Sequence, residues 1–284
     1  GLINVGTYPK QVIDEANEDL HTFESFLIKA GVKVYRPDFK QIPNYYNYCP
    51  RDTVLVHDDL ILATPNPLRA REFEYKAMED ILTLYSEVTT IDIKRTNELY
   101  NINCIGNPNV LALNETEPAF DAANILRDND NLYYLVSNSG NKKGAEQLQE
   151  LHPNKKVWPI EGVYSYMHLD STIALLREGL MLLNPSRIKS IEQLPKPLQN
   201  WDVIWCPEPV DIGHYPKYCN ASPWINMNLL SINPGLVVLE MHQTNLRTEL
   251  AKHNIESVML PMRHARTLGG CFHCVTLDII RDHQ

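Results

Sequence analysis

Two short apolar strands joined by a polar turn are encoded at residues 53–63, in the stretch TVLVHDDLILA. The run TVLV precedes the turn HDD, and a second apolar run, LILA, follows it. Aliphatic and β-branched runs of this length on either side of a polar turn are typical of a β-hairpin. After Pro65 and Pro67, an amphipathic pattern from about Arg69 to Tyr85 predicts a helix.

The same module recurs along the chain at a spacing of roughly 55–60 residues. The further copies are 172–183 with a shorter helix after Pro185, 227–239 with a helix from about Asn245 to His253, and a less regular copy around 109–119 with 132–136 and a helix near 144–151. A fifth copy is split between a C-terminal strand at 272–280 and an N-terminal helix and strand at 15–35. Because a module with one apolar face cannot stand alone, we expect the copies to close into a ring; the alternative is an open α/β sheet with similar hairpins.

Composition sets limits on the class of protein. The 284 residues are 44% hydrophobic and 21% charged, and the formal net charge is −9. This acidic excess argues against nucleic acid or an anionic membrane as the main partner. No apolar run approaches the length of a membrane span, and residues 1–20 resemble neither a secretory signal nor a transit peptide. The six scattered cysteines predict reduced thiols and a cytoplasmic location.

Polar residues recur where the modules begin. Asp52 precedes the strand at 53, Asp121 lies in EPAFDAA, His168 and Asp170 precede the strand at 172, and Ser222 precedes the strand at 227. Each has an ordinary structural explanation: Asp52 as a turn residue, Asp121 as a helix N-cap, the His–Asp pair as a solvated pair on one strand face. If the modules are related by rotation, however, these positions converge near the ring axis.

A glycine-rich segment ending in a cysteine lies near the C-terminus, LGGCFHCVTLD at residues 268–278. Cys271 and Cys274 have the C-x-x-C spacing of redox pairs and half zinc sites, but Cys206 and Cys219 lack the close spacing that would complete a zinc site. A buried core thiol remains an alternative for Cys271. For Cys274, a candidate histidine base and several carboxylates favour a nucleophile.

Several carboxylates around a thiol favour a cationic electrophile. A guanidinium is planar, permanently charged and a donor on every nitrogen, so carboxylates can bind it bidentately. Ester or amide substrates would instead require oxyanion donors, which carboxylates would oppose. The pattern therefore favours attack on an amidino carbon.

These segments resemble the amidinotransferase family of the pentein superfamily, which includes arginine:glycine and inosamine-phosphate amidinotransferases. The matching segments, in family order, are PRDTVLV with FEYKA at 50–77, EPAFDAAN at 117–124, MHLDST at 167–172, LLNPSR at 182–187, SPWINMNLL at 222–230 and ARTLGGCFHCVTLD at 265–278. The resemblance implies a five-unit α/β propeller with pseudo-fivefold symmetry, formed by residues 1–284 as a single domain. It implies no metal and no cofactor.

By position, the resemblance also assigns site residues. It implies Cys274 as the nucleophile, His168 as the general acid–base and Asp121 as the carboxylate that orients His168. Asp52 and Asp170 would hold the guanidino group, and Arg187 and Ser222 would bind the amino-acid end of the donor.

The implied reaction moves the amidino group of L-arginine through a covalent amidino-cysteine to an amine. We expect glycine as the acceptor, with guanidinoacetate and ornithine as products. Cys271, which replaces a family glycine, and the segment Tyr164–Tyr166 before the MHLD motif put that acceptor in doubt. The alternatives are another amine acceptor, a deiminase that forms citrulline and ammonia, or a non-catalytic metal-binding or ligand-binding protein. Small-molecule substrates are the expected partners, and a homodimer is compatible with the family.

Overall fold

The computed structural model describes residues 6–37, 46 and 48–281, and its strands form four sheets of three strands each. The strands are β1 (Val54–His57), β2 (Leu60–Ala63), β3 (Val88–Thr90), β4 (Ile125–Asp128), β5 (Asn131–Leu135), β6 (Lys156–Ile160), β7 (Ile173–Arg177), β8 (Leu180–Leu183), β9 (Asp202–Trp205), β10 (Leu230–Asn233), β11 (Leu236–Glu240) and β12 (Glu256–Leu260). In every sheet the first two strands form an antiparallel hairpin, and the third strand runs parallel to the second. The recurrent hairpin predicted from the sequence is therefore confirmed.

Two-residue turns close the hairpins and fix their register. Asp58, Asn129 and Gly179 lie in such turns with φ of 50°, 41° and 77°. Positive φ is what the twist of a tight hairpin requires, and Asp, Asn and Gly adopt it most readily. The register follows from the turn, as in the pairing of His57 with Leu60.

Helical segments connect the hairpins to the third strands, because a parallel pair needs a crossover. The α-helices are α1 (Lys10–Lys29), α2 (Glu79–Leu82), α3 (Lys142–Leu151), α4 (Thr244–Lys252) and α5 (Ala265–Leu268). The 3₁₀ helices are η1 (Pro50–Asp52), η2 (Arg69–Arg71), η3 (Glu74–Ala77), η4 (Asn97–Leu99), η5 (Ile102–Cys104), η6 (Ala122–Asn124), η7 (Ile191–Gln193), η8 (Lys196–Asn200) and η9 (Pro223–Met227). Helices α3 and α4 confirm two of the predicted helices.

The other predicted helices are interrupted. Residues 69–85 form η2, η3 and α2 instead of one helix, because Arg71 and Glu74 turn inward to a buried ion pair. The segment after Pro185 forms η7 and η8, since Pro195 and Pro197 prevent a longer helix.

Some predicted strands were misplaced. Residues 109–119 contain only an isolated bridge at Leu113, and the first strand of that module is β4, which ends at the turn before β5. In the third module the strand starts at Leu230, because η9 occupies residues 223–227.

The C-terminal strand predicted at 272–280 is absent among the residues described. The segment instead closes local turns, with Val275 N–H donating to Cys271 and Thr276 N–H to His273. At the other end of the chain, α1 confirms the predicted helix, whereas residues 32–37 form no strand.

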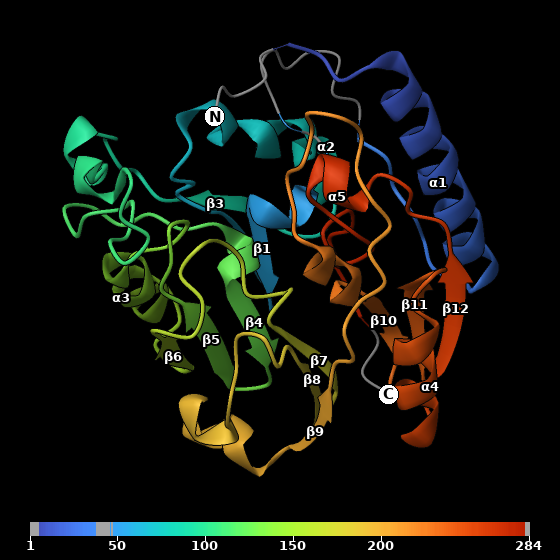
Figure 1. The fold of residues 1–284 in the computed structure, drawn as a ribbon. Helices are drawn as coiled ribbons and strands as arrows, with labels where there is room; N and C mark the ends of the chain where they lie inside the picture. The colour runs from blue at the N-terminus through green and yellow to red at the C-terminus, as the bar shows by residue number, and fades with distance from the viewer. Residues whose placement is uncertain (1–5, 38–45, 47, 282–284) are drawn as a thin grey trace.

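Apolar clusters link the sheets in sequence. Leu62 packs with Leu132, joining the first sheet to the second, and further clusters join the second sheet to the third and the third to the fourth. Phe23 of α1 packs with Val238 of β11 and with Phe272, while Leu277 packs against Val54 of β1. Helix α1 and the C-terminal segment therefore lie between the fourth sheet and the first, and Figure 1 shows α1 beside β12.

None of the helices in the described part of the chain is both long and apolar enough to cross a membrane.

Candidate active site

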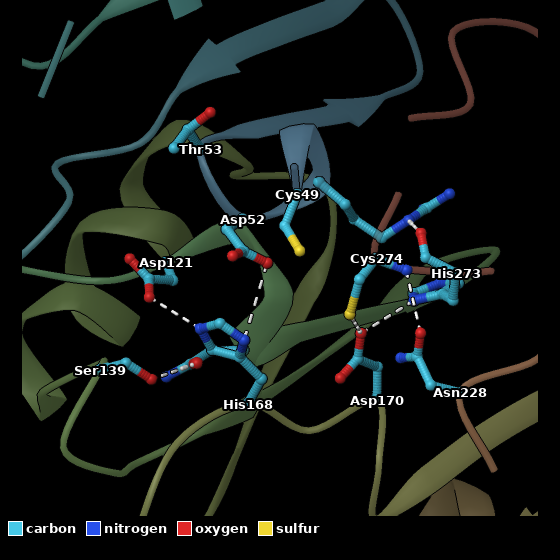
Figure 2. A network of polar contacts seen from close by, with 12 residues as sticks. Cys49, Asp52, Thr53, Asp121, Ser139, His168, Asp170, Asn228, His273 and Cys274 are labelled. Carbon is cyan, nitrogen blue, oxygen red and sulfur yellow. Dashed lines mark hydrogen bonds and ion pairs between the residues drawn. The ribbon is translucent and has the colours of Figure 1, made fainter. Parts of the chain in front are cut away.

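Five of the predicted residues meet at one place although they are distant in sequence. Asp52 ends η1, Asp121 precedes η6, His168 and Asp170 precede β7, and Cys274 lies in the C-terminal segment. Figure 2 shows the side chains of all five turned toward a common space. His168 and Asp170 precede β7 as predicted, and both point inward, so the alternative of a solvated pair on a strand face does not apply.

Cys274 is buried, and both its backbone and its thiol have polar partners. Its N–H donates to Oδ1 of Asn228 over 3.0 Å, and its Sγ donates to Oδ2 of Asp170 over 3.2 Å. A hydrogen bond with the Cys49 thiol, burial and the Asp170 carboxylate raise the pKa of Cys274 well above its ordinary value. Cys274 therefore rests as a protonated thiol.

Glycine is required at the two positions before Cys271 for different structural reasons. Gly269 ends α5 with φ of +80°, which favours glycine at a helix C-terminus. A Cβ at Gly270 would lie 2.6 Å from Sγ of Cys49 and 2.9 Å from Cβ of Cys274. Glycine at that position therefore lets the chain bring the nucleophile against Cys49.

His168 is paired with Asp121. Its Nε2 lies 2.8 Å from Oδ2 of Asp121, whose Oδ1 accepts a hydrogen bond from Asn66 Nδ2. Asp121 makes no side-chain cap to η6, so its ordinary role as an N-cap does not apply here. Burial alone would lower the pKa of His168, but Asp52, Asp121 and Asp170 together raise it to about 9.

Asp52 is held by a buried arginine that the sequence did not single out. Oδ2 of Asp52 accepts a hydrogen bond from Nη1 of Arg71 over 2.8 Å, and Arg71 also binds Glu74. Oδ1 of Asp52 is buried without a hydrogen-bond partner and lies 3.7 Å from Nδ1 of His168. A buried acceptor without a partner is costly unless a ligand satisfies it.

Asp170 has an unpredicted partner as well. Nδ1 of His273 lies 3.0 Å from Oδ2 of Asp170, the oxygen that also accepts the Cys274 thiol. Although burial alone would raise the pKa of Asp170, the contacts with His273 and His168 hold it well below its ordinary value. Asp170 is therefore a carboxylate beside the Cys274 thiol.

The two predicted residues for the amino-acid end lie outside this network. Nη1 of Arg187 donates to the carbonyl and hydroxyl of Ser171 and to Thr172 Oγ1, and the guanidinium lies 3.6 Å from the ring centre of Tyr164. Arg187 is thus fixed by the two residues that follow Asp170 in the chain. Ser222 is exposed at the start of η9, and its side chain makes no capping hydrogen bond there.

The two cysteines of the C-x-x-C pair have different surroundings. Cys271 is fully buried in an apolar cluster with Phe23 and Phe272, whereas Cys274 faces carboxylates. Within the ranges that the structure describes, no group of three or more His, Cys, Asp or Glu side chains is arranged to hold a metal ion.

Such a site can bind a planar cation next to a thiol. Asp52 and Asp170 supply negative charge, and the protonated His168 is a proton donor in the same space. A buried thiol nucleophile with a general acid and two carboxylates is suited to an electrophilic carbon in a guanidinium.

Known proteins share both the sequence and the fold. No protein-family model matches the chain. It is 40% identical to inosamine-phosphate amidinotransferase 1 of Streptomyces glaucescens, over 98% of this chain and 84% of that protein. It is 30% identical to the mitochondrial glycine amidinotransferase of Xenopus tropicalis, over 97% and 71%. The solved inosamine-phosphate amidinotransferase of Streptomyces griseus superposes with a TM-score of 0.90 at 40% identity, covering 98% of this chain and 83% of that one.

Proposed function

The chain belongs to the amidinotransferase family, and we propose that it transfers the amidino group of L-arginine to an amine through a covalent intermediate on Cys274. One observation carries the proposal: the buried, unpartnered Oδ1 of Asp52 opposite Asp170, with the Cys274 thiol and His168 between them. A guanidinium at this point would satisfy Oδ1 of Asp52 and place its carbon near the sulfur.

The first half-reaction follows from the protonation states. Sγ of Cys274 passes its proton to Oδ2 of Asp170, the oxygen to which it is hydrogen-bonded, and forms a bond to the guanidino carbon. The bond from that carbon to the δ-nitrogen breaks, and His168, with its pKa raised to about 9, donates a proton to the departing amine. Ornithine leaves, and an amidino-thioether remains on the enzyme.

The second half-reaction reverses these roles. The acceptor amine attacks the amidino carbon, the neutral His168 takes the amine proton, the carbon–sulfur bond breaks, and the sulfur takes its proton back from Asp170. Asp121 holds the imidazole in place for both steps. Arg187, rigid between Ser171, Thr172 and Tyr164, is a fitting cation for the α-carboxylate of the donor.

The acceptor is the finer part of the proposal. Glycine was the expectation from sequence, but the relatives at 40% identity are named for inosamine phosphates, whereas glycine amidinotransferase is at 30%. We therefore place an amino group on a phosphorylated cyclitol first, and glycine second, among the acceptors to be tested.

Incubation with L-arginine and one amine at a time tests the proposal. The amines are an inosamine phosphate, glycine and lysine, with a sample that contains no amine as the control. Beyond one equivalent per enzyme, ornithine should form only with an acceptor, in equal amount to the new guanidino compound. Citrulline formed at the same rate with or without an amine would identify a hydrolase and contradict transfer.

For the architecture, we propose that the four sheets and a fifth unit, made of α1 and the C-terminal segment, form the five-unit propeller expected from the sequence. Its support is the series of apolar clusters that joins each unit to the next, including Leu277 against β1.

A further inference from the structure

The two carboxylates that flank the nucleophile are held in the same way. Asp52 has its Oδ2 occupied by Arg71 and its Oδ1 without a partner. Asp170 has its Oδ2 occupied by His273 and Cys274, and Oδ1 accepts no hydrogen bond from any residue that the structure describes. Each carboxylate therefore keeps one oxygen fixed by the protein and one oxygen for a ligand.

His273 is itself held firmly. Its carbonyl accepts a hydrogen bond from Nε of Arg51 over 2.7 Å, and its N–H donates to the carbonyl of Asn228 over 3.3 Å. Arg51 is buried and also binds Asp278 over 2.9 Å. These backbone contacts fix the position from which the imidazole reaches Asp170.

The charge of the imidazole matters as much as its position. Burial, and then the positive charge of Arg51, lower the pKa of His273, so the ring is neutral near pH 7. Because its partner is a carboxylate, Nδ1 carries the proton and donates it to Oδ2. A second cation at this point would repel an incoming guanidinium, whereas a neutral donor holds Asp170 without that cost.

The sharing of Oδ2 links the imidazole to the nucleophile. An oxygen that already accepts from His273 is a weaker acceptor for the Cys274 thiol, so the thiol proton is held less tightly. Without the imidazole, Oδ2 would bind the thiol more strongly, or the carboxylate would rotate and lose the free oxygen.

We propose that His273 is a positioning residue for amidino transfer, a neutral donor that orients Asp170 so that Oδ2 meets the Cys274 thiol and Oδ1 faces the guanidinium. This inference rests on the proposed function and deepens it, because it adds a second histidine that never touches the substrate.

Two substitutions distinguish the effect of the Nδ1–H donor of His273 from the effect of the volume of its ring. His273→Asn places an amide nitrogen near the position of Nδ1, whereas His273→Phe keeps the ring without a donor. His242→Phe is the matched control, because Nδ1 of His242 also contacts a carboxylate, Oε1 of Glu240 at 2.7 Å, but its side chain is 57% exposed and lies outside the site.

Two readouts are measured, kcat/KM for arginine and the pH dependence of Cys274 alkylation by iodoacetamide without substrate. For His273→Phe we expect kcat/KM to fall about tenfold to a hundredfold, the usual effect of losing a hydrogen bond to a charged group. The alkylation profile should also move to higher pH. His273→Asn should recover most of both values, and His242→Phe should match the wild type.

A purely structural role for His273 would lower activity without moving the alkylation profile, and that result would overturn the proposal. Equal values for the Asn and Phe variants would overturn it as well. Alkylation needs no turnover, so it still tests His273 if no amine accepts the amidino group, whereas failure of the proposed function would appear as absent ornithine in the wild type.

Discussion

At the scale of single residues, the cysteines at 271 and 274 have opposite surroundings. Burial raises the pKa of Cys271 far above its ordinary value, in a cluster of apolar side chains. Cys274 lies against Asp170 and Asn228 in the polar network. The difference argues that the C-x-x-C spacing is incidental, and it supports the proposed role of Cys274 alone as the nucleophile.

Substitution of each cysteine by serine tests this assignment. Cys274→Ser should lower kcat for ornithine release by more than about a thousandfold, because a hydroxyl is a far weaker nucleophile. Cys271→Ser should keep most of the activity and instead lose about 1–3 kcal/mol of stability, since it buries a hydroxyl among apolar groups. Steady-state kinetics and urea unfolding measure the two effects, and similar activity losses in both variants would contradict a single nucleophile.

The pairing of His168 with Asp121 gives a prediction for the pH profile. In the proposed mechanism His168 donates a proton to ornithine, so kcat/KM for arginine should fall as pH rises through about 9. Asp121 favours the imidazolium, and its replacement in Asp121→Asn should lower the pKa of His168. The falling limb should then start at lower pH. A variant with a lower rate but an unmoved limb would contradict the role of Asp121.

The reactive side chains of the site could be predicted from the sequence, whereas the residues that hold them in place could not. Asp52, Asp121, His168, Asp170 and Cys274 stand at recurring positions or in specific motifs, which is why they could be predicted. Arg71 and His273 could not, because an arginine in an amphipathic pattern and a histidine beside a cysteine have many ordinary roles. Their function depends on Asp52 and Asp170, which lie close to them only in the folded chain.

At the scale of elements, local signals predicted the hairpins but not the third strands. The turns at Asp58 and Gly179 lie between apolar runs, and this pattern is readable within a dozen residues. Strands β3, β6, β9 and β12 follow a crossover and pair in parallel with a distant neighbour, so their position depends on tertiary packing. The apolar run at 272–280 shows the converse, because it looks like a strand but forms turns.

Side chains replace strand pairing in holding that C-terminal segment. Arg51 of η1 binds the carbonyl of His273, Oγ1 of Thr276 and the carboxylate of Asp278. Although burial alone would raise it, Arg51 and Arg281 keep the pKa of Asp278 well below its ordinary value. The segment that carries the nucleophile is thus attached to the first unit by one buried cation.

Arg51→Met should therefore be strongly destabilising, by about 3 kcal/mol, because it leaves the Asp278 carboxylate without its buried partner. Arg281→Met is the control: Arg281 also binds Asp278, at 3.2 Å, but it is 45% exposed, and its loss should cost less than about 1 kcal/mol. Unfolding in guanidinium chloride measures the free energy of unfolding of both variants.

Asp278 ionises more readily in the folded chain, so its contribution to stability is present above its ordinary pKa and is lost as pH falls. The difference between the Arg51 variant and the wild type should accordingly shrink in acid.

At the scale of the whole molecule, helix α1 near the N-terminus packs against the C-terminal segment that carries Cys274. Asp19 of α1 accepts hydrogen bonds from the N–H and Nε of Arg263, and Glu15 lies 2.7 Å from Nε2 of His264. The ring of Phe23 meets that of Phe272 edge to face, with centroids 4.8 Å apart. Helix α1 therefore packs on a segment that lies two residues from Cys274. This contact agrees with the predicted pairing of the N-terminal helix with the C-terminal segment, whereas the strands predicted for that unit are absent from the residues described.

Removal of the Phe23 ring tests whether that contact serves both stability and activity. Phe23 is 2% exposed, and Phe23→Ala should destabilise the fold by about 3–5 kcal/mol through the lost burial and the cavity beside Phe272. Because Phe272 then loses its support, kcat/KM for arginine should also fall at temperatures where the variant is still folded. Phe73→Ala removes a ring that is 54% exposed and should change neither quantity measurably. Circular dichroism gives the folded fraction and initial rates give the activity. A Phe23 variant that is destabilised but fully active while folded would show that α1 closes the structure without positioning the nucleophile.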